Sequence, residues 1–142
     1  MKALISRDDT TGHRFEGHTA AILHHLIHLG PCHLRLHHGG PLLETATAFG
    51  LFLARGPVLH DAASGLALDP RRVPLAYLLP AAEGEGALLC LATAAGEITA
   101  TIRPRAAACG GFHDLVAIHH PAPVDAAAIR ARLHAAALVR AA

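Results

Sequence analysis

The chain has 142 residues, of which 52% are hydrophobic and 16% are charged, and its net charge is +1 with histidine neutral. A composition this apolar excludes a disordered chain. The net charge is small, the arginines are scattered and aromatic residues are few, and these features exclude a nucleic-acid-binding surface. We therefore expect one globular domain over residues 1–142 that binds no nucleic acid.

The first half of the chain alternates between strand and helix patterns. A run with apolar residues at helical spacing ends at Gly30 and Pro31, a pair that stops a helix. A second apolar run lies between glycine and proline residues at both ends, and its length favours a helix. The expected elements are a strand over 2–6, a helix over 17–29, a strand over 32–38, a helix over 42–54 and short strand-like pieces over 57–68.

The expected strand over 32–38 alternates between apolar and polar side chains. Leu34 and Leu36 lie on one face, while His33 and His37 lie on the other. The connection to the preceding helix is only two residues long, so we expect the strand to fold back on that helix. The two leucines then meet the apolar face of the helix, and the two histidines point away through the sheet.

The second half of the chain is richer in strand patterns. Ala95 and Gly96 form a plausible hairpin turn, and the final segment carries an apolar stripe at helical spacing. The expected elements are strands over 73–79, 86–94, 97–103 and 113–119, followed by a helix that begins at 123–125 and whose stripe is Ala126, Ile129, Leu133 and Ala136. Together these elements predict the α+β class: a mostly antiparallel sheet with two or three packed helices, in a single layer-on-layer domain.

No apolar run is long enough for a signal peptide or a membrane span. Cys32, Cys90 and Cys109 are widely spaced and form no C-x-x-C motif, which favours reduced thiols over a disulfide framework. We expect a cytoplasmic protein without a membrane partner.

Histidine is the outstanding residue type, with 13 copies in a chain that has no asparagine, glutamine or tryptophan. It is the commonest metal ligand in proteins. His25 and His28 stand three residues apart on the expected helix, on the face opposite its leucines, and this spacing can hold one metal ion. An H-E-x-x-H protease site is excluded, because the residue after His24 is His25 rather than glutamate.

Further histidines stand at the ends of expected strands, where binding sites tend to open. His60 and His113 each precede an aspartate, and His119 and His120 follow the apolar run 115–118. The candidate metal ligands are His113, His119, His120, His60, His25 and His28. A site rich in imidazole and poor in thiol or carboxylate suits Zn, Ni, Cu(II) or Fe rather than Ca or Mg.

Two functions follow. The first is a small histidine-rich protein that binds a divalent transition metal, with catalysis left undecided. The alternative is a non-catalytic α+β interaction module or accessory subunit, whose histidines simply cover its surface. The low charge content favours a homo-oligomer or a subunit of a protein complex in either case, because it leaves little polar cover for the surface.

Overall fold

The computed structural model describes residues 11–26, 31–36, 43–48, 53–61, 67–80, 87–104 and 111–141. The strands within these ranges are β1 (Thr11–Glu16), β2 (Pro31–Leu36), β3 (Leu43–Ala48), β4 (Leu53–Arg55), β5 (Val58–His60), β6 (Ala67–Leu68), β7 (Leu75–Leu79), β8 (Leu88–Ala92), β9 (Ile98–Pro104) and β10 (Ala122–Asp125). The helices are α2 (Thr19–Leu26), α3 (Gly111–His119) and α4 (Ala126–Ala141), with a 3-10 turn, η3, over Pro70–Arg72.

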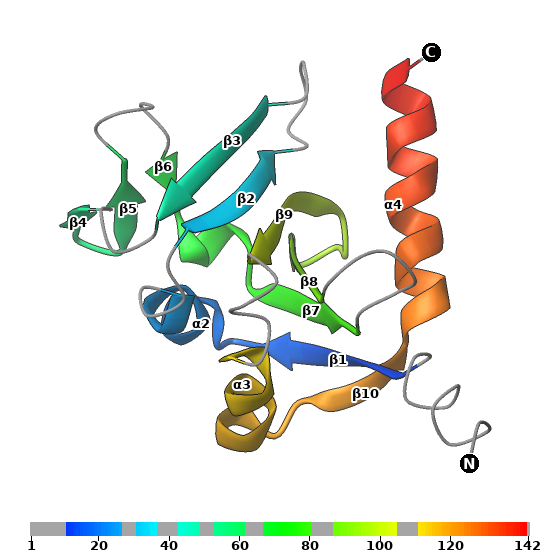
Figure 1. Ribbon diagram of the computed structural model, residues 1–142, viewed down its shortest axis with the longest axis horizontal. Helices are drawn as coiled ribbons and strands as arrows, with labels where there is room; N and C mark the ends of the chain where they lie inside the picture. Colours follow the sequence, from blue (N-terminus) through cyan, green and yellow to red (C-terminus); the bar gives the residue numbers. More distant parts are fainter. Residues whose placement is uncertain are drawn as a thin grey trace.

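Antiparallel pairing joins the strands into two sheets. The larger has seven strands in the order β10-β1-β7-β8-β9-β2-β3, and the smaller has three in the order β4-β5-β6. The small sheet lies at the end of the molecule opposite α4 (Figure 1). This arrangement confirms the predicted α+β class with a mostly antiparallel sheet and packed helices.

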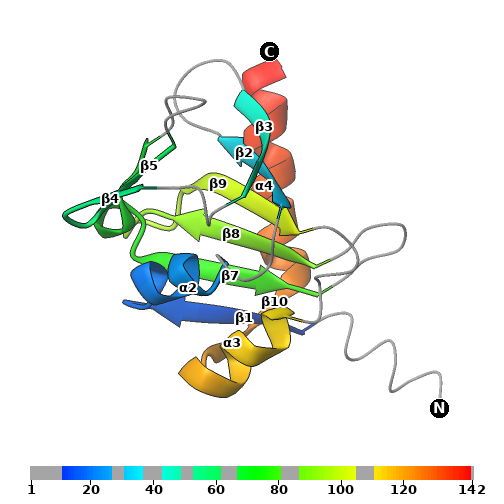
Figure 2. The ribbon, with the colours of Figure 1, turned by 60° about the vertical axis from the view of Figure 1, so that its left-hand side comes forward.

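The large sheet is covered on both faces, with α2 and α3 on one side and α4 on the other (Figure 2). The core beneath α2 and α3 includes Phe15, Leu34 and Leu91. The core beneath α4 includes Tyr77 and Cys90. All five residues of β7 are buried, as expected for a strand whose two faces both contact other elements.

Several sequence predictions are confirmed. The helix expected over 17–29 is present as α2, and β2 folds back on it so that Leu34 shares a core with Ile22 and Leu26. Leu36 packs at the edge of the same core, while His33 is exposed on the opposite face; His37 lies outside the described residues. The strands over 73–79, 86–94 and 97–103 appear as β7, β8 and β9, and the strand-like pieces over 57–68 as β5 and β6.

The predicted turn and C-terminal helix are present as well. Gly96 turns between β8 and β9 with a φ of 89°, and its N–H donates to the carbonyl of Thr93 at 2.8 Å. In α4, Ala126 and Ile129 are buried and Leu133 is half-buried, as the stripe required. The side chain of Ala136 and the strand expected over 2–6 lie outside the description.

Two predictions are wrong. Residues 42–54 do not form a helix, because residues 43–48 pair with all six residues of β2 as β3, and residues 53–55 form β4. Residues 113–119 do not form a strand but most of α3, in which Phe112, Leu115 and Val116 recur at helical spacing and pack on the sheet. A short apolar run fits either structure, and here tertiary packing decides.

Two strands were not predicted at all. The first is β1, which is rich in polar residues. The second is β10, which contains Pro123; a proline lacks the backbone N–H, and this is tolerated because β10 lies at the edge of the sheet. Separately, no helix in the described part of the chain is both long and apolar enough to cross a membrane.

Candidate functional site

The six predicted metal ligands do not form a single site. His60 lies in β5 of the small sheet, whereas His25 lies in α2, and His119 is the last residue of α3. His120 follows α3, so His119 and His120 end a helix and not a strand. His113 lies in the first turn of α3, but its side chain is outside the description, as is the whole of His28.

The structure brings His25, His119 and His120 together with a fourth residue, His18. We call these four residues the histidine cluster. The rings of His18 and His119 are in contact, with centroids 4.6 Å apart and planes inclined by 31°. The edge of the His119 ring also meets Phe15, whose centroid lies 6.2 Å away at an interplanar angle of 81°.

Local backbone structure positions the two residues whose rings are in contact. His18 immediately precedes α2, and its carbonyl accepts the hydrogen bond of the Ile22 N–H at 2.9 Å. The buried hydroxyl of Thr19 donates to the carbonyl of Val73, which anchors the start of this helix. At the end of α3, the N–H of His120 donates to the carbonyl of Val116 at 3.1 Å. The two helix ends therefore hold His18 against His119.

Burial lowers the pKa of His119 below its ordinary value, and the positive charges of His18, His25 and His120 lower it further. The cluster is thus electrostatically coupled around His119. Among the residues that the structure describes, however, no group of three or more His, Cys, Asp or Glu side chains has an arrangement that could hold a metal ion.

A second cluster lies on the opposite face of the sheet. His33 and Arg35 occupy alternate positions of β2, and His33 is directly opposite Arg103 of β9. Arg35 is opposite Thr101, so it is a diagonal neighbour of Arg103 on the same face. With Arg130 of α4, these residues form what we call the basic face: His33, Arg35, Arg103 and Arg130.

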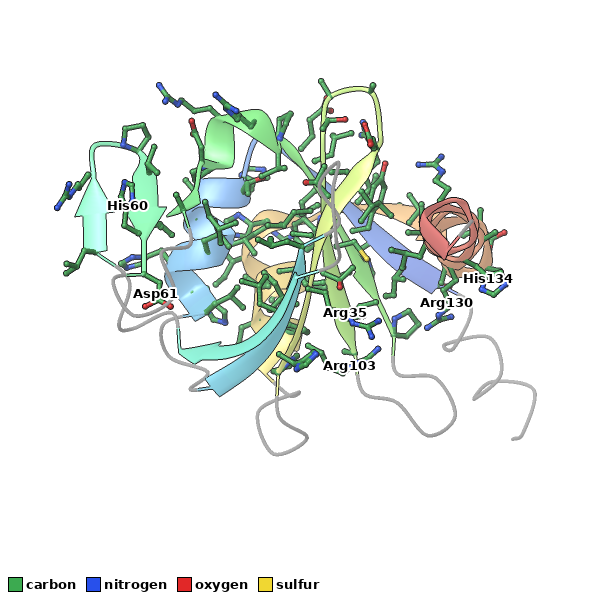
Figure 3. The ribbon with its side chains drawn as sticks, turned by 90° about the horizontal axis from the view of Figure 1, so that it is seen from above. Arg35, His60, Asp61, Arg103, Arg130 and His134 are labelled. Atoms are coloured by element: carbon green, nitrogen blue, oxygen red, sulfur yellow. The ribbon has the colours of Figure 1, made fainter. Side chains whose placement is uncertain are left out.

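Arg103 of β9 and Arg130 of α4 both influence the Cys90 thiol. Burial raises the pKa of this thiol to about 12, and the charges of the two arginines act in the opposite direction. Arg130 is held by a hydrogen bond from its Nη2 to the carbonyl of Pro80, at 2.6 Å. Figure 3 shows Arg35 and Arg103 on the strand side and Arg130 on the neighbouring flank of α4, far from His60 and Asp61.

The four residues of the basic face differ in exposure. His33 and Arg35 are exposed, while Arg103 and Arg130 are half-buried. Other atoms of Arg103 interact with their surroundings, but its buried Nε has no hydrogen-bond acceptor among the residues that the structure describes. His33, Arg35 and Arg103 also interact within the fold, and Glu44 of β3 is directly opposite Arg35 in the strand register. The described residues thus gather three guanidinium groups beside the α4 core, a type of group that binds carboxylates and phosphates.

The sequence predicted only part of the basic face. The alternation in 32–38 placed His33 on the face away from α2, but it did not indicate that Arg103 and Arg130 lie on the same side of the sheet. That arrangement depends on β9 lying next to β2 and on α4 packing on this side of the sheet.

No family model matches the chain, and no curated protein matches it. Solved structures do share its fold. A crystal structure of ChuX superimposes with a TM-score of 0.61 at 13% identity, covering 75% of this chain and 76% of that one. A structure described as that of the heme binding protein ChuX gives 0.58 at 12% identity, over the same shares of the two chains.

A protein from Erwinia carotovora also matches, with a TM-score of 0.59 at 14% identity, covering 77% of this chain and 76% of that one. At identities this low, the likeness shows a common fold.

Proposed function

We propose that this domain binds haem on its basic face. One observation carries the proposal: His33 lies directly across the strand pair from Arg103, and Arg35 is the diagonal neighbour of Arg103 on the same face. The fold shared with a structure described as a heme binding protein supports the choice of ligand.

The residues of the basic face fit the chemistry of haem. Haem carries two propionate carboxylates, and guanidinium groups bind carboxylates through paired, charge-assisted hydrogen bonds. Arg35, Arg103 and Arg130 supply three such groups. Histidine is a common axial ligand of haem iron, and His33 supplies an imidazole on this face.

An apolar flank suits the porphyrin ring. Leu88 and Leu133 are partly buried hydrophobic residues packed against the core beneath α4. Leu89 is opposite Ile102, so its neighbour Leu88 borders Arg103 on this side of the sheet. Bound haem would supply a redox-active iron, while the chain's own residues bind and orient it.

This proposal narrows the prediction of a transition metal to iron held in a porphyrin. The residue proposed to coordinate the iron is His33, which is not one of the six histidines expected from the sequence. Reversible carriage of the ligand is the function we propose, and a metal-dependent reaction stays a prediction.

Haem titration followed by absorption spectroscopy tests the proposal. Arg35→Ala should weaken binding roughly 10- to 100-fold, because a hydrogen bond to a charged group contributes about 1.5–3 kcal/mol and each 1.4 kcal/mol is tenfold in affinity. His33→Ala should also shift the Soret band through loss of the imidazole. Both residues are exposed, so neither change should impair folding.

Matched controls lie on the small sheet. Arg55→Ala and His60→Ala remove the same residue types from β4 and β5, and both should bind haem as the unaltered protein does. Equal affinity in the Arg35 and Arg55 variants, or no saturable binding by the unaltered chain, would refute the proposal.

A further inference from the structure

We infer that the histidine cluster is a separate binding site for a divalent transition ion such as Zn²⁺ or Cu²⁺, held by His18 and His119. This inference is independent of the haem proposal, since the cluster and the basic face lie on opposite sides of the large sheet.

The separation of the two rings agrees with joint coordination of one ion. A metal–nitrogen bond of about 2.0–2.1 Å places the centroids of two adjacent imidazole ligands roughly 4.5–5.2 Å apart, for bond angles between square-planar and tetrahedral values. The His18 and His119 centroids are 4.6 Å apart. The ring planes are inclined by only 31°, as in a stacked contact, so the two side chains must rotate about their own bonds to point a nitrogen of each ring at one ion.

The backbones of both ligands are held by the fold before any ion arrives. The backbone of His18 is held by the first hydrogen bond of α2 and by the adjacent anchor from Thr19 to Val73. His119 ends a helix whose Phe112 and Leu115 are buried in the core. Preorganised ligands lower the entropy cost of binding.

His120 is the third imidazole available at this site. It is exposed and directly follows His119 in the chain. The described residues contain no ready-made group of three ligands, so water or a rotated His120 must complete the coordination. Imidazole ligands favour Zn, Ni or Cu(II) and disfavour Mg or Ca.

Isothermal titration of the full-length, untagged, haem-free and chelator-treated chain with ZnCl₂ tests the inference. One ion should bind per cluster. His18→Ala and His119→Gln should each weaken this event at least tenfold, since even residues that only support metal ligands cost about 10- to 100-fold in affinity. Glutamine keeps a polar side chain of similar size at position 119, which guards against a folding defect.

Controls separate this site from other histidines and from the haem proposal. His60→Ala and His134→Ala should leave zinc binding unchanged, and MgCl₂ should produce no heat of binding. Electron paramagnetic resonance of the Cu²⁺ complex should show nitrogen ligands that are lost in the His119 variant. Arg35→Ala should keep zinc binding, and His119→Gln should keep haem binding.

Two results would overturn the inference. One is zinc affinity unaltered in both the His18 and the His119 variants, which would place binding at other histidines. The other is an equal loss in the His60 control, which would indicate unspecific binding.

Discussion

At the scale of single residues, His119 is the side chain whose ionisation the fold disturbs most clearly among the histidines described. Burial and three neighbouring imidazoles favour its neutral form and lower its pKa. Its folded-state pKa therefore lies below the unfolded value of about 6.5. The ring contact with His18 joins the start of α2 to the end of α3, two positions far apart in the sequence.

This lowered pKa predicts acid sensitivity in the metal-free protein. A histidine with a depressed folded-state pKa contributes stability that is full above about pH 6.5 and is lost as the pH falls through the folded-state pKa. Urea unfolding at pH 7.5 and 5.5 with chelator present should show this loss, and His119→Gln should reduce it. An identical pH dependence in both proteins would contradict the prediction.

Thr19 offers a second residue-scale prediction. Its buried hydroxyl donates to the carbonyl of Val73, and valine has the same shape without the donor. Thr19→Val should lower the free energy of unfolding by about 1–3 kcal/mol, because the carbonyl loses its buried donor. Chemical denaturation measures this change. An exposed control, Thr11→Val, should change stability by less than about 0.5 kcal/mol, and an equal effect at both positions would count against the anchoring role.

At the scale of elements, hydrophobic periodicity correctly predicted the segments whose apolar pattern matches the face that they bury. α2, β2 and β7 to β9 could be predicted because each has one dominant periodicity and clear ends. β3 and α3 could not, since their apolar runs suit strand and helix alike and the partner element decides. The same limit applies to the candidate site: His33 and Arg35 share a face by alternation, but Arg103 joins them only through strand order.

The pairing of β2 with α2 is open to a direct test. Leu34 is fully buried in the shared core, whereas Leu53 of β4 is 60% exposed. Leu34→Ala should cost about 2–5 kcal/mol of unfolding free energy through lost burial and a residual cavity. Leu53→Ala should cost well under 1 kcal/mol. Denaturation of both variants provides the comparison, and similar losses would show that β2 is not packed on α2 as described.

At the scale of the whole molecule, the two edges of the large sheet bear on assembly. β3 and β10 end the strand order within the described residues, and an edge strand presents unpaired backbone groups to a neighbouring chain. Together with the low charge content, this favours self-association. Light scattering at micromolar concentration should report a dimer or larger, and a monomer of 14.8 kDa would refute the prediction.

The two faces of the sheet carry different candidate ligand groups: the histidine cluster lies on the α2–α3 side, and the arginines of the basic face lie with His33 on the α4 side. Nuclear magnetic resonance with paramagnetic ferric haem distinguishes them directly, because the iron broadens the signals of nearby amides. Haem bound to the basic face should broaden the signals of His33, Arg35 and Arg103 and leave those of His18 and His119 sharp. Broadening confined to His18, His119 and their neighbours would contradict haem binding on the basic face.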